Sequence, residues 1–108
     1  MLSTFALVGK VKTLPEIRQT SQGNQVATLD LSVERPFRNS DGSITIDTFK
    51  ITLWKGIAQM CVDICRQGDV IAVKGRLQDM VYQKDSYEYH NVELVAEKVS
   101  FVQPVSRV

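Results

Sequence analysis

The segment from Gln25 to Arg35 constrains the fold most, because apolar and polar residues alternate along its length. The odd-numbered positions from Ala27 to Val33 are apolar, and the even-numbered positions from Thr28 to Glu34 are polar. Successive side chains of a β-strand point to opposite faces, so this segment is expected to be a strand with one buried and one solvated face. Such strands are typical of antiparallel sheets.

Four more segments have the composition of strands and are bounded by turn residues: Phe5–Val11, Ile44–Lys55, Val70–Tyr82 and Tyr87–Val102. One helix is predicted between the third and fourth strands, from Gly56 to Gln67. Its apolar residues have helical spacing, and Gly68 is a suitable stop signal. The residues of this apolar stripe are Ile57, Cys61, Ile64 and Cys65.

Glycines at positions 9 and 75 interrupt strands, and such residues let a sheet bend and close into a barrel. We therefore predict an all-β fold. The order of elements matches a five-stranded oligonucleotide/oligosaccharide-binding (OB) Greek-key barrel with one helix between strands 3 and 4. The pattern alone also fits other small barrels.

The chain has 108 residues, which suits one domain, and we assign residues 1–104 to it, with 105–108 as a short end. No apolar run approaches the roughly 20 residues that span a bilayer, and no secretory signal pattern begins the chain. We expect a cytoplasmic protein that does not contact membranes. Thirteen basic residues against 12 acidic ones give a net charge of +1, so only the distribution of charge can indicate a nucleic-acid partner.

Neither a metal site nor a catalytic site is evident in the sequence. Cys61 and Cys65 lie four residues apart, on one face of the predicted helix, and His90 is far away in sequence. We interpret both cysteines as small buried apolar residues, and we expect no cofactor. No serine–histidine–aspartate arrangement and no glycine-rich phosphate loop is present, so an enzyme is the least favoured class.

The stretch VERPFRNSDG at 33–42 places an aromatic residue between two arginines just before a polar turn. Turns are normally small and polar, so Phe37 is either a buried anchor or an exposed platform for a flat, negatively charged ligand. Its neighbours Arg35 and Arg38 favour the second interpretation, since two charged guanidinium groups are rarely found beside a buried anchor.

The chain resembles bacterial single-stranded DNA-binding proteins along almost its full length. The matching stretches are LVGKV, PEIR, QVATLDLSVERPF, TLWKGIAQ, QGDVIAVKGRLQ and VELVAEKVSFVQP, in this order and with matching spacing. The resemblance implies the OB barrel, sequence-tolerant binding of single-stranded DNA in replication, recombination and repair, and usually a homotetramer. The sequence alone leaves a dimer open. An open first strand and outward apolar residues such as Val95 would pair with a second copy.

The family normally adds a flexible tail that ends in acidic residues and Pro-Phe and recruits partner enzymes. Residues 105–108 contain no acidic residue, which fits a trimmed chain or a naturally tailless one. Recruitment of replication and repair enzymes by that route is therefore doubtful.

The resemblance assigns base stacking to three aromatic residues, Phe37, Trp54 and Tyr82, which match family stacking positions. The expected contacts to the DNA backbone are basic residues in the same segments: Lys10, Lys12, Arg18, Arg35, Arg38, Lys50, Lys55, Arg76 and Lys84. Tyr87, Tyr89 and Thr48 are further candidate contacts.

Several positions depart from the family pattern. Thr48 stands where the family usually has an aromatic residue, and we expect Phe49 to face the core or a subunit contact instead. Asp79 and Met80 replace basic residues before Tyr82, which should weaken binding or reduce its salt dependence. We expect His90 to pack in the core or in an interface.

Two alternatives remain open. One is a primosome-type OB-fold protein, a dimeric barrel that bridges DNA and helicase-loading proteins. The other is a protein-interaction module with weakened DNA binding, which the near-neutral charge and the residues at 48 and 79 favour. A steep dependence of oligonucleotide affinity on salt would exclude the interaction module.

Overall fold

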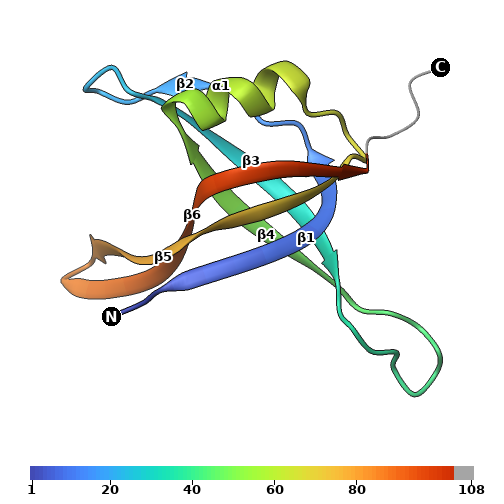
Figure 1. Ribbon diagram of the computed structural model, residues 1–108. Coiled ribbons are helices and arrows are strands. Elements are labelled where there is room, and N and C mark those ends of the chain that lie inside the picture. Colours follow the sequence, from blue (N-terminus) through green and yellow to red (C-terminus); the bar gives the residue numbers. More distant parts are fainter. Residues whose placement is uncertain (104–108) are drawn as a thin grey trace.

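The computed structural model describes residues 1–103. These residues form six strands and one helix (Figure 1): β1 (Thr4–Thr13), β2 (Arg18–Gln19), β3 (Gln25–Glu34), β4 (Ile46–Trp54), α1 (Lys55–Ile64), β5 (Val70–Lys84) and β6 (Tyr87–Gln103). The five long strands and the helix agree with the prediction. The two-residue strand β2 was not predicted, and the last predicted residue of the domain, 104, lies with residues 105–108 outside the described part.

The sheet closes on itself. Strand β1 pairs with β5 from Thr4 to Lys10 and with β3 from Lys10 to Thr13, so the hydrogen-bonded order β1–β5–β6–β4–β3 returns to β1. All pairings are antiparallel except that of β4 with β6. This connectivity confirms the predicted five-stranded OB barrel, and β2 is added at the free edge of β3.

The barrel interior is filled by the apolar sides of the alternating strands. Leu29 and Leu31 of β3 and Ile51 and Leu53 of β4 are fully buried, and Phe49 is partly buried on the same side of β4. The polar residues between them point outward, as the alternation predicts. Once one side chain of a strand lies inside the barrel, the residues before and after it along the strand must lie outside.

Helix α1 covers one end of the barrel and contacts β3, β4 and β6 (Figure 1). Its buried residues are Ala58 and Cys61, with Cys65 buried just beyond the last turn. The helix ends at Ile64, three residues earlier than predicted, because the chain is already extended at Cys65. The prediction that Ile64 belongs to the buried stripe is wrong, since this side chain is 48% exposed.

The two cysteines are buried and form no disulfide, as their interpretation as small apolar residues requires. A hydrogen bond with Cys65 and burial both raise the pKa of the Cys61 thiol far above its ordinary value. Cys61 is therefore a neutral thiol at physiological pH and not a reactive thiolate.

Gly75 is required by close contact between strands and not only by backbone freedom. A Cβ atom at this position would overlap the carbonyl oxygen of Val95 on β6. The pairing of β5 with β6 also shifts register between Lys74 and Gly75, where the bend is predicted.

Two predicted roles need correction. Val95 shares the outward face of its register partners Thr52 and Arg76, as predicted, but its side chain is only 2% exposed, so little of it is accessible to a second copy. His90 lies on the same side of the hairpin as Val92, as predicted, but its exposure excludes the core role, and the interface role stays a prediction. This histidine lies on the part of β6 that extends with β5 beyond the barrel, where its Nδ1 is 2.7 Å from Asp79 Oδ2.

Candidate nucleic-acid interface

The outer face of β4 is the centre of the candidate site. Lys50, Thr52 and Trp54 alternate with the buried residues Ile51 and Leu53, so all three lie on the outside of the barrel. Trp54 is the last residue of β4 and precedes α1, and its side chain is partly buried. The predicted outward orientation of Trp54 is confirmed.

A chain of hydrogen bonds continues this face onto the neighbouring strands. Thr52 Oγ1 donates to Glu93 Oε2 on β6 (3.1 Å), and Gln78 Nε2 on β5 donates to Glu93 Oε1 (2.6 Å). Glu93 and Gln78 are direct register partners, so they point to the same side of the β5–β6 hairpin. Strands β4, β6 and β5 therefore share one continuous surface, which we call the outer sheet face.

Three tyrosines extend the outer sheet face along the β5–β6 hairpin, which projects beyond the barrel (Figure 1). Tyr82 and Tyr89 are register partners, and their rings stack with centroids 5.3 Å apart and planes inclined by 17°. Tyr87 pairs with Lys84 and is 69% exposed. Tyr82 remains 46% exposed, so its stacking on Tyr89 leaves ring surface available to a ligand.

The hairpin register corrects the prediction for Asp79. Direct partners share a face, so Asp79 points with Val81, His90 and Val92 away from Tyr82, and only Met80 lies on the tyrosine side. Asp79 therefore removes no positive charge from the surface next to Tyr82. The same register explains why Tyr87 and Tyr89 lie opposite Val92, as predicted.

The loop at 35–45, between β3 and β4, holds Phe37 away from the barrel. Its side chain is 57% exposed, which confirms the exposed orientation predicted for it and excludes a core anchor. Hydrogen bonds across the loop define its shape: the Arg35 amide donates to the Thr45 carbonyl, and the Asn39 amide to the Ser43 carbonyl. Phe37 itself takes no part in these bonds.

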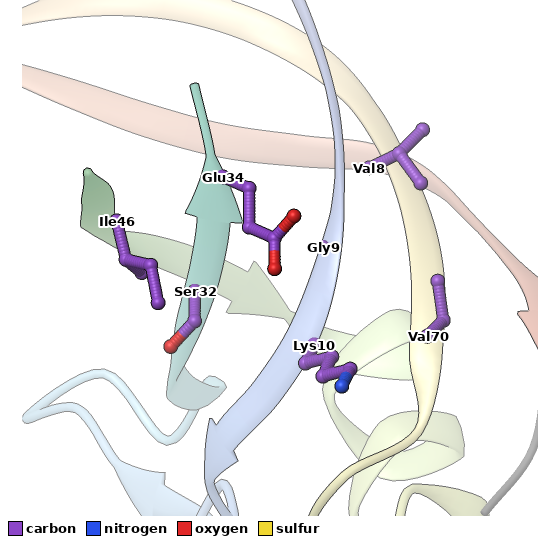
Figure 2. Close-up of a pocket in the computed structure, with 7 residues that line it drawn as sticks. All are labelled: Val8, Gly9, Lys10, Ser32, Glu34, Ile46 and Val70. Atoms are coloured by element: carbon purple, nitrogen blue, oxygen red, sulfur yellow. The ribbon is translucent and has the colours of Figure 1, made fainter. Parts of the chain in front are cut away.

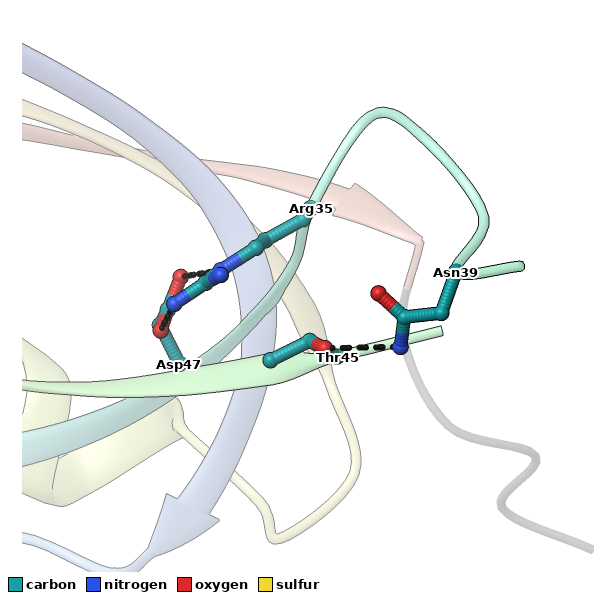
Figure 3. Close-up of polar contacts among 4 residues, drawn as sticks. All are labelled: Arg35, Asn39, Thr45 and Asp47. Atoms are coloured by element: carbon teal, nitrogen blue, oxygen red, sulfur yellow. Dashed lines mark hydrogen bonds and ion pairs between the residues drawn. The ribbon is translucent and has the colours of Figure 1, made fainter. Parts of the chain in front are cut away.

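Side chains brace the same loop (Figure 3). Arg35 Nε and Nη2 donate to the two carboxylate oxygens of Asp47 at 3.0 and 3.1 Å, and Asn39 Nδ2 donates to Thr45 Oγ1 at 3.0 Å. Arg38 Nη1 donates to the carbonyl of Gly42 at 2.9 Å. The hydrogen bond from Arg35 holds the pKa of the Asp47 carboxyl below its ordinary value.

The predicted cations are spread around the outside of the barrel, and three of them bind carboxylates. Besides the Arg35–Asp47 pair, Lys50 Nζ lies 3.2 Å from Asp30 Oδ1, and Arg76 Nη1 lies 3.6 Å from Glu97 Oε2. These three carboxylates were not identified from the sequence. Asp30 and Lys50 could have been found, because both lie on the polar faces of strands that are adjacent in the predicted barrel.

Other cations lie beside the predicted aromatics. Arg18 on β2 and Trp54 on β4 are both register partners of Val26, so their backbones are about 10 Å apart across β3. Lys55 follows Trp54 directly and is exposed, and Lys84 ends β5 next to Tyr87. The described residues show no ion pair at Arg18, Lys55 or Lys84.

Strand β1 carries the two remaining predicted cations. Lys12 Nζ donates to Thr48 Oγ1 at 3.4 Å, so Thr48 lies on the outer surface, as a residue at a lost stacking position would. Lys10 borders an open pocket of about 310 Å³ along the edge of β1 (Figure 2). The pocket is lined by Val8, Gly9, Lys10, Ser32, Glu34, Ile46 and Val70, and it contains none of the predicted stacking aromatics.

The described residues contain no group of three or more histidine, cysteine, aspartate or glutamate side chains arranged to hold a metal ion. Among the same residues, no helix is long and apolar enough to cross a membrane. The features that recur in the candidate site are exposed aromatic rings and cations on a twisted sheet.

Two known proteins are similar to this chain over nearly its whole length. Single-stranded DNA-binding protein B from Bacillus subtilis is 33% identical over 108 residues, covering 99% of this chain and 96% of that protein. Single-stranded DNA-binding protein 3 from Listeria innocua is 34% identical over 95% of this chain, which spans 65% of that longer protein.

A crystal structure is also similar. It contains a deletion variant of the single-stranded DNA binding protein from Thermus aquaticus, with a TM-score of 0.77 and 25% identity, over 94% of this chain and 51% of the other. The model of the single-strand binding protein family matches residues 2–102. This chain therefore belongs to the single-strand binding protein family.

Proposed function

We propose that the protein binds single-stranded DNA without sequence preference and without catalysis. Bases stack on Phe37, Trp54 and Tyr82, with Tyr87 and Tyr89 extending the platform on the hairpin. The observation that carries this proposal is that Phe37, on the loop between β3 and β4, and Tyr82, on the β5–β6 hairpin, both expose their rings, while Trp54 lies on the outer face of β4. Stacking tolerates any base, because every base has a π-face.

The basic residues supply the second part of the proposal. Arg18, Lys55 and Lys84 lie next to the aromatic residues and are available to phosphates, whereas Arg38 and Lys12 make only single hydrogen bonds to neutral oxygens. Contacts of this kind add affinity that falls as the salt concentration rises. The processes served would be replication, recombination and repair, at the nucleoid in the cytoplasm.

Self-association belongs to the same proposal. From Thr4 to Gly9, strand β1 pairs with β5 on one side and with no strand on the other side among the described residues. This second side of β1 is therefore an open edge. Val8 and Ile46 are more than half exposed beside this edge, in the pocket of Figure 2. A second copy that adds its own β1 here would cover both side chains, and closed assemblies such as a dimer or a tetramer would follow.

Fluorescence anisotropy of a labelled oligo(dT), titrated with the protein at low salt, tests the proposed function. A duplex of the same length is the control. The proposal predicts a saturable increase in anisotropy with the single strand and much weaker binding of the duplex, whose bases are not available for stacking. No increase with the single strand would leave the protein-interaction module as the better hypothesis.

A further inference from the structure

Three of the cations predicted to contact DNA are paired with carboxylates of the same chain, and the Arg35–Asp47 pair has a different geometry from the other two. Arg35 contacts Asp47 through two parallel hydrogen bonds, whereas the Lys50–Asp30 and Arg76–Glu97 pairs each have a single short nitrogen–oxygen distance. A two-point contact between guanidinium and carboxylate is the strongest form of such a pair. Asp47 therefore holds its cation more firmly than Asp30 and Glu97 hold theirs.

The position of the pair matters because Arg35 is two residues from Phe37. A base stacked on Phe37 would carry its phosphate past the start of the loop, where Arg35 lies. In the structure the Nε and Nη2 donors of Arg35 point at Asp47 and not into solvent beyond the loop (Figure 3). A phosphate has the same negative charge and a similar pair of oxygens, so it would compete for the same donors.

Breaking the pair has two consequences for binding. The released Asp47 carboxylate would stay close to the phosphate and repel it, which lowers the affinity. In addition, a phosphate contact normally releases a counterion from DNA, but a released carboxylate attracts a cation from solution, so the net release of ions is smaller. Both groups are substantially exposed, at 45% for Arg35 and 38% for Asp47, so the pair contributes little to folding stability.

We propose that Asp47 acts as a built-in competitor of DNA phosphate at Arg35, limiting both the affinity for single strands and its dependence on salt. This inference rests on the proposed function. It assigns to Asp47 a part in setting how strongly the protein holds DNA, and it leaves base stacking as the dominant source of affinity at the loop.

The test is Asp47→Asn in the full chain, measured by anisotropy with labelled oligo(dT) over a range of salt concentrations. Asparagine has the same shape and can still accept one hydrogen bond from Arg35, so the loop keeps its geometry. The affinity at low salt should rise about five-fold, the factor for two unit charges about 4 Å apart in water. The slope of log affinity against log salt should steepen by about 0.7, the value for one additional phosphate contact on a single strand.

Two further variants separate competition from a general effect of charge. Asp63→Asn makes the same chemical change on the exposed side of α1, where Asp63 accepts a hydrogen bond from the neutral Gln59 side chain. It should change affinity and slope much less than Asp47→Asn. In the Arg35→Gln background, Asp47→Asn should no longer steepen the salt slope, because no guanidinium is left for the carboxylate to occupy.

The inference is overturned if the wild-type protein binds and Asp47→Asn binds with the same affinity and slope. It is overturned equally if Asp63→Asn gives the same gain, or if Asp47→Asn steepens the slope as much in the Arg35→Gln background. If neither the wild-type protein nor Asp47→Asn binds oligo(dT) at low salt, the proposed function itself fails, and this inference fails with it.

Discussion

Replacing Phe37 with alanine separates binding from folding at a single residue. Its side chain is 57% exposed, and the hydrogen bonds that shape its loop run between other residues, so the folded state loses little when the ring is removed. Exposed substitutions of this kind usually change the free energy of unfolding by at most about 0.5 kcal/mol. The melting temperature of Phe37→Ala should therefore stay close to that of the wild-type protein.

The effect on DNA binding should be much larger. Loss of one stacking ring costs about 1–3 kcal/mol of binding free energy per base, so the Kd for oligo(dT) should rise by about 5- to 150-fold. The assay is anisotropy titration at fixed low salt, paired with thermal unfolding followed by circular dichroism. Stacking releases few counterions from DNA, so the slope of log affinity against log salt concentration should stay unchanged.

Phe37→Leu is the matched control, because leucine keeps an apolar side chain at the loop but offers no flat ring. It should lose nearly as much affinity as the alanine variant. An affinity preserved in Phe37→Leu would show that Phe37 acts by apolar contact and not by stacking. A large drop in melting temperature with unchanged affinity in Phe37→Ala would refute the reasoning entirely.

Three further predictions concern the hairpin, the core and the loop. Tyr89→Ala should weaken oligo(dT) binding in the anisotropy assay and Tyr89→Phe should not, since a phenyl ring can still stack on Tyr82; equal losses would contradict this. Ile51→Ala should lower the free energy of unfolding in urea by about 2–5 kcal/mol, because Ile51 is fully buried; a change under 1 kcal/mol would contradict the assigned core. The hydrogen bond from Arg35 depresses the pKa of Asp47, so its contribution to loop order is complete above the ordinary value of 3.8 and is lost as pH falls through the lower folded value. An NMR titration of the Asp47 carboxyl carbon should show a midpoint below 3.8 that rises toward this value in Arg35→Gln, and a midpoint unchanged by that substitution would exclude the ion pair in solution.

The strands could be predicted because alternation of polarity is a local property of the sequence. Once Leu29 and Leu31 face the interior, the side of every other residue on β3 follows, and the same holds for Trp54 against Leu53 on β4. The exposure of Phe37 was predicted for a similar reason, since a proline, two arginines and a polar turn leave no apolar neighbours for it.

Contacts between strands were harder to predict, because they depend on register. The stacking of Tyr82 on Tyr89 requires a two-residue turn at Asp85 and Ser86, both with positive φ, and Asp-Ser is a weaker signal for such a turn than Asn-Gly. The pairing of Arg35 with Asp47 depends in the same way on the loop length between β3 and β4. The placement of Asp79 beside Tyr82 needed no register to be corrected, because residues three apart on one strand face opposite sides.

The end of α1 shows the limit of a periodic pattern. Ile64 continues the apolar spacing of the helix, yet the last turn lies at the rim of the barrel end and leaves this side chain in solvent. Spacing predicts which residues share a face of the helix, but the extent of the surface beneath the helix decides how many of them are buried.

The most direct test of the account is the intrinsic fluorescence of Trp54, the single tryptophan of the chain, titrated with oligo(dT) at low and high salt. Binding to a labelled oligonucleotide is measured in parallel under the same conditions. The account predicts strong, saturable quenching that follows the binding curve and requires more protein as salt rises. Binding without any quenching would show that DNA does not contact Trp54 on the outer face of β4. No binding at low salt would contradict the proposed function.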